Sequence, residues 1–349
     1  MTEERPNPLG VDGFEFVEFA APDPGSLHEL FPRMGFSATA RHRSQNITLY
    51  RQGEINFLVN EEPDSFAAAF AREHGPCCSG FALRVADAQQ AFEATTGQGA
   101  ASMANASGVA VDIPRIEGIG GSILYLADRR NGSVLDRDYQ PIEGADPAPK
   151  GFGLTFIDHL THNVYQGNMD QWADYYSRLF GFYEVRYFDI KGQQTGLTSR
   201  AMTSPTGAIS IPINESAEPK SQINEYLDLY KGAGVQHISL YTENIYETVE
   251  AMHEAGIAFL DTPDTYYEII DRRIPKHAED LERMQKNRIL IDADEETKEK
   301  LLLQIFTQTN IGPIFFEIIQ RKGNKGFGEG NFTALFESIE LDQMRRGVL

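Results

Sequence analysis

The chain has 349 residues, of which 41% are hydrophobic and 11% are aromatic. This length and composition suffice for a folded core and predict two domains rather than one. The formal net charge of -20, from 51 acidic and 31 basic residues, argues against a nucleic acid or an anionic membrane as partner. It still admits an anionic substrate, because a metal ion can dominate the field inside a pocket.

Cysteine usage and the N-terminus indicate the cytoplasm. Cys77 and Cys78 are the only cysteines, and adjacent residues offer no ordinary long-range disulfide. Residues 1–10 are polar and include two prolines, and no stretch resembles a signal peptide or a membrane span. We therefore expect a soluble cytoplasmic protein.

In chain order, the first half begins with a predicted strand near residues 11–20, a predicted helix over 24–33, and a Gly-Phe turn into another strand. The same succession begins again at Ile157, with a predicted helix over 169–180 and a second Gly-Phe turn. With the turns as anchors, Gly13 aligns with His159. The sequence therefore contains an internal repeat.

Two later blocks repeat in the same way. Gly80-Phe81-Ala82-Leu83 aligns with His237-Ile238-Ser239-Leu240, and Ile123-Leu124-Tyr125-Leu126 aligns with Phe315-Phe316-Glu317-Ile318. Arg129 then aligns with Arg321. We predict an α+β fold of two copies, each made of paired βαβββ modules whose sheets curl into an open barrel around a cavity.

The stretch 131–153 is rich in proline and glycine and is predicted to be a linker. It would separate a first domain, 1–130, from a second domain, 154–349. The second copy also carries an insertion between Gly256 and Phe315. We expect this insertion to build or cover a site; it contains 266–273, the charged helix-like run 276–286 and the strand-like 289–291.

The stretch from Ile157 to Val164 is apolar at both ends and predicts a buried strand. Side chains alternate between the two faces of a strand. His159 and Thr161 should therefore share one face, and Asp158 should point to the other.

Three aligned positions differ in chemistry between the copies. The first copy holds Gly13, Gly80 and Tyr125, and the second holds His159, His237 and Glu317. Two imidazoles and one carboxylate are the ligands of a facial triad on non-haem Fe(II), which leaves coordination positions open. The same set can hold zinc with a catalytic water.

The alternative is that each of these three residues is buried and satisfied by local hydrogen bonds. It is weakest for Glu317, which lies in an apolar strand, because an unpaired buried carboxylate is costly. The other histidines are predicted to be structural or exposed; they are His28, His42, His74, His162, His253 and His277.

Five stretches of the second half carry a family resemblance. They are Asp158-His159-Leu160-Thr161-His162-Asn163-Val164, Gly234-Val235-Gln236-His237-Ile238, Leu303-Gln304-Ile305-Phe306-Thr307, Phe316-Glu317-Ile318-Ile319-Gln320-Arg321 and Gly326-Phe327-Gly328-Glu329-Gly330-Asn331-Phe332. Together they resemble the catalytic domain of the 4-hydroxyphenylpyruvate dioxygenase family, within the vicinal oxygen chelate superfamily. The first half, without metal ligands, is also similar to that family.

The resemblance implies one Fe(II) per chain, held by His159, His237 and Glu317. It implies that Gln304 and Ser199 orient the oxo-acid end of the substrate. It implies that Asn214, Gln222 and Gln236 contact the ring end of the substrate and its phenol, and that Phe327 and Phe332 sandwich the ring and shield it from solvent. A C-terminal helix over 333–344 would act as a lid.

The function implied is the conversion of 4-hydroxyphenylpyruvate and O2 to homogentisate and CO2, in tyrosine and phenylalanine catabolism, by a homo-oligomer (a dimer or a tetramer). Alternatives are 4-hydroxymandelate synthase, extradiol or glyoxalase chemistry, and a non-catalytic ligand-binding protein. Ser199, Pro212 and Asn214 favour the dioxygenase over the synthase. The three candidate ligands favour an enzyme over a binding protein.

Overall fold

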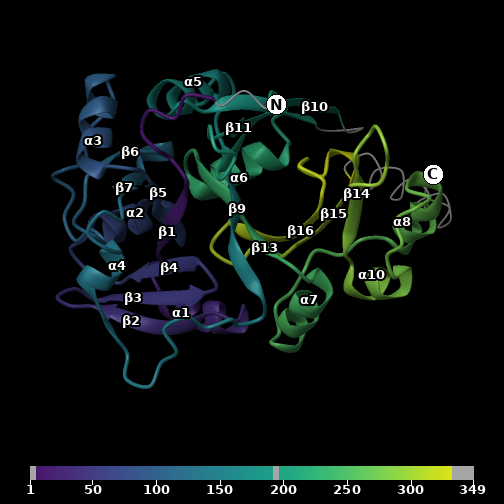
Figure 1. Cartoon of the computed structure of the whole chain (residues 1–349), viewed down its shortest axis with the longest axis horizontal. Helices are drawn as coiled ribbons and strands as arrows, with labels where there is room; N and C mark the ends of the chain where they lie inside the picture. Colours follow the sequence, from purple (N-terminus) through teal and green to yellow (C-terminus); the bar gives the residue numbers. More distant parts are fainter. Residues whose placement is uncertain (1–4, 192–195, 332–349) are drawn as a thin grey trace.

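A computed structural model describes residues 5–191 and 196–331, and each half of the chain forms one eight-stranded sheet (Figure 1). The strands of the first half are β1 (Gly13–Ala20), β2 (Ser37–His42), β3 (Ile47–Gln52), β4 (Ile55–Asn60), β5 (Cys77–Arg84), β6 (Arg115–Glu117), β7 (Ile123–Ala127) and β8 (Tyr139–Pro141). Its helices are α1 (Gly25–Arg33), α2 (Phe66–His74), α3 (Ala88–Gly97) and α4 (Val134–Asp138).

The strands of the second half are β9 (Leu154–Asn163), β10 (Tyr183–Lys191), β11 (Gly196–Thr203), β12 (Ser210–Glu215), β13 (Gly234–Thr242), β14 (Leu290–Ala293), β15 (Leu301–Phe306) and β16 (Phe315–Lys322). Its helices are α5 (Met169–Phe180), α6 (Gln222–Tyr230), α7 (Ile245–Glu254), α8 (Asp264–Glu268), α9 (Ile270–Arg273) and α10 (Leu281–Asn287).

The two sheets repeat one topology. Seven strands of the first sheet, in the order β6-β7-β5-β1-β4-β3-β2, correspond to β15-β16-β13-β9-β12-β11-β10 of the second, and β8 and β14 are additional edge strands. The parallel pairs β1 with β4 and β5 with β7 recur as β9 with β12 and β13 with β16. The predicted tandem α+β architecture is therefore confirmed.

Some predicted boundaries differ from the structure. The stretch 131–153 contains α4 and β8, and β8 pairs with β2 at one edge of the first sheet. The division into domains at 130 and 154 stays a prediction. The helix expected over 276–286 begins only at Leu281, because Asp280 caps it by accepting a hydrogen bond from the backbone of Arg283.

Strand pairing corrects one alignment of the repeat. Ala82 pairs with Phe16, and its equivalent Ser239 pairs with His159. Phe16 therefore occupies the position of His159, and the alignment with Gly13 is wrong. The chain between this strand and the Gly-Phe turn is longer in the second half, which displaced an alignment anchored on the turns.

Side chains fill the first half where the second half holds its candidate site. The Tyr125 ring lies 5.1 Å from the Phe16 ring, and a Cβ added at Gly80 would come within 3.1 Å of it. An apolar core continues around them and includes Leu49, Leu58, Val111, Leu135 and Tyr139. Gly13 lies outside this core, next to the flexible end of the Arg84 side chain.

The two halves also share one larger hydrophobic core. Phe57 of β4 contacts Phe316 of β16, with ring centroids 6.0 Å apart. His74 of α2 is buried and hydrogen-bonds through Nδ1 to the carbonyl of Tyr230 at 2.7 Å. The sheets therefore pack as one unit.

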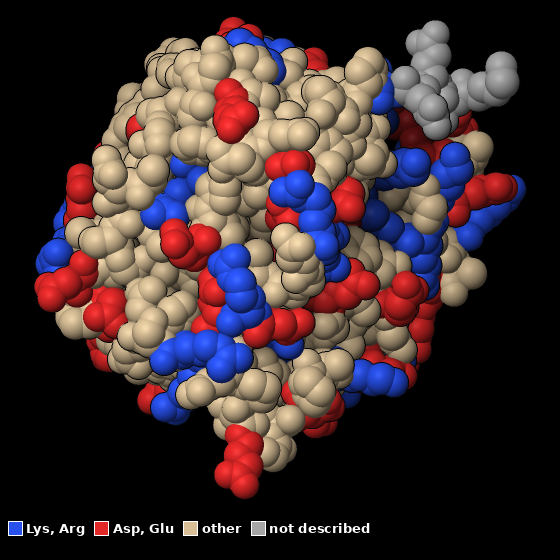
Figure 2. Space-filling model, turned by 60° about the vertical axis from the view of Figure 1, so that its left-hand side comes forward, with Lys and Arg blue, Asp and Glu red and all other residues tan. Residues whose placement is uncertain are grey.

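The surface carries charges of both signs. On the face in Figure 2, acidic and basic side chains are interspersed. Among the described residues, no helix is both long enough and apolar enough to cross a membrane.

Glu18, on β1 of the first half, has a buried carboxyl group. It accepts hydrogen bonds from Asn60 at 2.7 Å and from the Tyr125 hydroxyl at 2.8 Å. Burial raises its pKa to about 7, although these bonds and Arg115 oppose the rise. The folded chain therefore binds this proton more tightly than the unfolded chain does.

We predict that the free energy of unfolding falls as the pH rises from about 4.5 to about 7, and that Glu18→Gln removes this dependence. Glutamine mimics the protonated form of Glu18. The free energy of unfolding of Glu18→Gln should therefore exceed that of the wild type by about 3 kcal/mol at pH 8 and by little at pH 4.5. Urea unfolding at both pH values measures it. Glu143→Gln, at an exposed site of the same half, is the control, and an unchanged profile in Glu18→Gln would contradict the prediction.

Candidate metal centre

The three predicted ligands converge on three adjacent strands. His159 comes from β9, His237 from β13 and Glu317 from β16. Their ligand atoms all lie within 4.8 Å of one another. Glu317 Oε2 lies 3.0 Å from His159 Nε2 and 3.8 Å from His237 Nε2.

A β-bulge precedes each histidine. The pairing of β9 with β13 leaves Asp158 as the extra residue on one strand and Gln236 on the other. Asp158 Oδ1 lies 2.8 Å from His159 Nδ1, and Gln236 Oε1 lies 2.9 Å from His237 Nδ1. Because both oxygens accept, each Nδ1 carries a proton and each Nε2 faces the site.

The first bulge corrects a prediction. Strict alternation placed Asp158 on the face opposite to His159, but an extra residue in a strand changes the direction of its side chain. Asp158 therefore reaches the imidazole beside it. No residue pattern in the strand indicates the bulge.

The charges of the site are set by burial and by neighbouring carboxylates. Burial alone would lower the pKa of His159, but Glu317 and Asp158 raise it to about 9. Burial, together with the charge of His159, holds the pKa of His237 well below its usual value. In the metal-free chain, an imidazolium at His159 thus balances Glu317.

This donor set fits a divalent first-row transition metal. Two imidazole nitrogens and one carboxylate oxygen suit such an ion, and three protein ligands leave positions open. Each histidine has an acceptor on its second nitrogen, as metal-ligating histidines do. A metal would take the place of the proton on His159.

The candidate ligands line a cavity of about 350 Å³, a size within the usual range for small-molecule sites. Most of its wall is apolar, from Phe188, Leu197, Pro212, Ile223, Leu260, Phe306, Phe315 and Phe327. The His237 ring stacks on Phe315 with centroids 5.0 Å apart. A flat apolar ligand with polar ends matches this lining.

Only some of the predicted substrate-contacting residues line the cavity. Five of them line the cavity: Ser199, Asn214, Gln222, Gln236 and Phe327. Gln304 does not, because its buried side chain lies against Gly328, and its Oε1 has no hydrogen-bond partner among the described residues. Phe332 and the predicted helix over 333–344 lie outside the described residues.

The sequence reasoning missed the partners of the histidines. Asp158 receives both a bond from His159 and two from Arg321. The one signal that pointed to them was the repeat itself, which aligned Arg321 with Arg129.

Comparison with known proteins places the chain in a family. The model "Hydroxyphenylpyruvate dioxygenase, HPPD, N-terminal" matches residues 5–140, and the model of the glyoxalase/bleomycin resistance protein/dioxygenase superfamily matches residues 156–268. The 4-hydroxyphenylpyruvate dioxygenase of Pseudomonas aeruginosa is 52% identical over 99% of this chain and 98% of its own length. The chain belongs to the 4-hydroxyphenylpyruvate dioxygenase family. Like the family, it is a dioxygenase enzyme with two copies of the vicinal oxygen chelate fold.

Other matches agree with this assignment. Hemolysin VllY of Vibrio vulnificus is 53% identical over 98% of both chains. A solved fusion of a xylose isomerase-like TIM barrel with 4-hydroxyphenylpyruvate dioxygenase has a TM-score of 0.81 at 30% identity, over 97% of this chain and 54% of that chain. A mutant of 4-hydroxymandelate synthase from Streptomyces coelicolor has a TM-score of 0.81 at 23% identity, over 96% of this chain and 100% of its own, which supports the fold alone.

We predict that metal binding releases about one proton per ion below pH 9, because His159 must lose its proton to become a ligand. The affinity for Co²⁺ should therefore rise with pH up to about 9. Calorimetric titration in two buffers of different ionisation enthalpy counts the protons. Glu317→Gln should bind Co²⁺ far more weakly, whereas Tyr125→Phe, at the equivalent position of the first half, should bind normally; binding without proton release would contradict the assignment.

Proposed function

We propose that the chain is an Fe(II)-dependent dioxygenase that converts 4-hydroxyphenylpyruvate and O2 to homogentisate and CO2, as a step of tyrosine and phenylalanine catabolism. The observation that carries the proposal is the convergence of His159, His237 and Glu317 on an apolar cavity. The relatives named for this reaction, at about half identity over the whole length, support it. A cytoplasmic location and homo-oligomeric assembly stay predictions.

The three ligands hold the metal and set its charge. Two neutral imidazoles and one carboxylate leave a net positive charge that favours a chelating 2-oxo acid. When bound, Fe(II) supplies the redox chemistry with O2, and the oxo acid supplies the other electrons. The protein positions the substrate and shields the site from water.

Strand register suggests which residues contact the ring end of the substrate. Ser210 of β12 lies beside His159, whereas Asn214 lies beside Asn163, about 13 Å further along the strand. Asn214 pairs directly with Ser199 of β11. We therefore assign both residues to the phenol end, which changes the role predicted for Ser199.

Among the described residues, no group donates a hydrogen bond to the amide oxygen of Asn214. Its Nδ2 donates to Asn163 Oδ1 at 3.3 Å, which fixes the amide and directs its oxygen elsewhere. An amide oxygen is the acceptor that a phenolic hydroxyl needs. Ser199 offers a second polar contact beside it.

Phe327 covers the metal end. Its ring lies 5.4 Å from the His159 ring at an interplanar angle of 77°, and it lines the cavity. An apolar cover of this kind excludes water from the reacting atoms.

We predict that the Fe(II)-loaded protein, given 4-hydroxyphenylpyruvate in air, forms homogentisate with matched oxygen uptake. Chromatographic retention distinguishes it from 4-hydroxymandelate, which is an isomer and would identify the synthase reaction instead. Glu317→Ala should lower turnover by more than about 100-fold, since loss of a mere partner of a ligand typically costs 10- to 100-fold. Tyr125→Phe should retain activity. Full turnover in Glu317→Ala would contradict the metal site.

We also predict that Asn214→Ala raises the KM for 4-hydroxyphenylpyruvate by roughly 10-fold, because the phenol loses a buried hydrogen-bond partner. The inhibition constant of phenylpyruvate, which lacks the hydroxyl, should change little. An equal loss for both compounds would show that Asn214 does not contact the phenol.

A further inference from the structure

A buried ion pair lies directly behind His159. Arg321 donates through Nε and Nη2 to the two oxygens of Asp158, each at 2.7 Å. The side chains are only 19% and 8% exposed. A bidentate pair of this kind fixes the orientation of the carboxylate, and Asp158 in turn holds His159 Nδ1.

The third nitrogen of the same guanidinium binds the segment 324–331. Arg321 Nη1 donates to the carbonyl of Asn324 at 3.2 Å and to that of Gly326 at 2.6 Å. This segment carries Phe327, whose ring lies against His159 and lines the cavity. One side chain therefore bonds both the partner of a candidate ligand and the segment that covers it.

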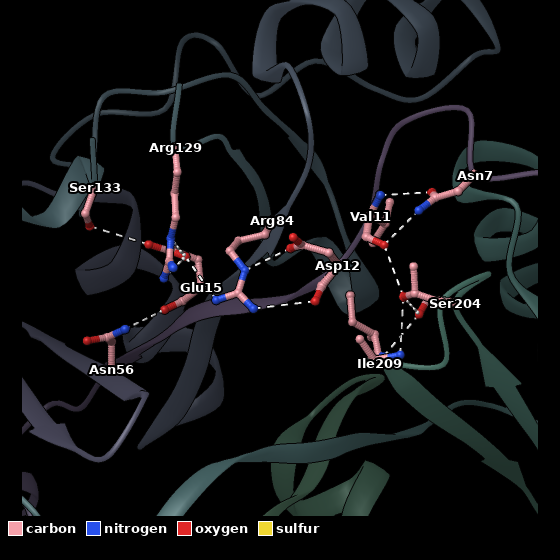
Figure 3. Close-up of polar contacts among 12 residues, drawn as sticks. Asn7, Val11, Asp12, Glu15, Asn56, Arg84, Arg129, Ser133, Ser204 and Ile209 are labelled. Carbon is pink, nitrogen blue, oxygen red and sulfur yellow. Dashed lines mark hydrogen bonds and ion pairs between the residues drawn. The ribbon is translucent and has the colours of Figure 1, made fainter. Parts of the chain in front are cut away.

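The first half contains an equivalent ion pair without a ligand (Figure 3), but there both Arg129 nitrogens contact one oxygen of Glu15, and Arg84 lies 3.6 Å from the same oxygen. Glu15 is the bulge residue of β1, as Asp158 is of β9, and Arg129 lies 3.0 Å from it. The residue after Glu15 is Phe16 rather than a histidine. Among the described residues, the Arg129 side chain bonds only Glu15.

This comparison separates what the pair does for the fold from what it does for the candidate metal site. The fold forms the pair in both halves, so a metal site is not needed to explain it. What the second half adds are the contact of one guanidinium with both carboxylate oxygens, the bond to His159 and the bonds to the carbonyls of segment 324–331.

We propose that Arg321 is a positioning residue that couples metal binding at His159 to the ordering of segment 324–331. The proposal rests on the metal site of the proposed function. Coupling is reciprocal: if the ordered segment strengthens metal binding through Arg321 and Asp158, then a bound metal must stabilise the ordered segment by the same free energy.

The test uses the full chain with Co²⁺ as the only added ligand, and it compares Arg321→Lys with Arg129→Lys. Lysine keeps a positive charge beside the carboxylate but lacks the planar fork that reaches Asp158 and both carbonyls. Arg129→Lys makes the same change in the half without a ligand. Asp158→Asn weakens the link from the other side and serves as the second variant.

Two quantities are measured, the Co²⁺ affinity and hydrogen exchange in 324–331 with and without Co²⁺. Amides of Gly326, Phe327, Gly330 and Asn331 are hydrogen-bonded and report on the segment. In the wild type and in Arg129→Lys, Co²⁺ slows this exchange. In Arg321→Lys and Asp158→Asn, the affinity falls roughly 10-fold and the slowing disappears.

Two outcomes would overturn the proposal. In the first, Arg321→Lys binds Co²⁺ as tightly as Arg129→Lys does. In the second, Arg321→Lys binds Co²⁺ more weakly, but Co²⁺ still slows hydrogen exchange in 324–331. Failure of the wild type to bind one Co²⁺ per chain would overturn the metal site itself.

Discussion

The extra residue of a β-bulge fixes the direction of each histidine in the candidate metal centre. Asp158 and Gln236 each precede their histidine, and each bonds its Nδ1. The site thus depends on a backbone irregularity more than on the ligands alone, because without the bulge the neighbouring side chain would point to the opposite face. The strand pairing on both sides of β9 holds these bulges in register.

The two halves share one fold, but the first half has a packed core where the second half has an open cavity. In the first half, Phe16 and Tyr125 occupy the positions of His159 and Glu317, and apolar side chains fill the space around them. Filling a cavity recovers packing energy that an open site forgoes. The second half therefore forgoes some stability to keep its cavity.

Much of this was predictable from the sequence, and the failures have physical causes. The internal repeat of strands and helices, together with the chemistry of His159, His237 and Glu317, located the candidate site. The pairing of Gly13 with His159 failed because the chain between the strand and the Gly-Phe turn differs in length between the halves. The face of Asp158 and the covered position of Gln304 depend on a bulge and on the approach of Gly328, which no single-residue pattern encodes.

The shared core explains why a copy without candidate ligands persists. Phe57 of the first half contacts Phe316, the residue directly before Glu317. Separating the halves would expose the apolar back of the sheet that carries the site. The copy without candidate ligands therefore serves as a scaffold for the other half, and packing constrains both faces of its sheet, one through this common core and the other through the core around Phe16 and Tyr125.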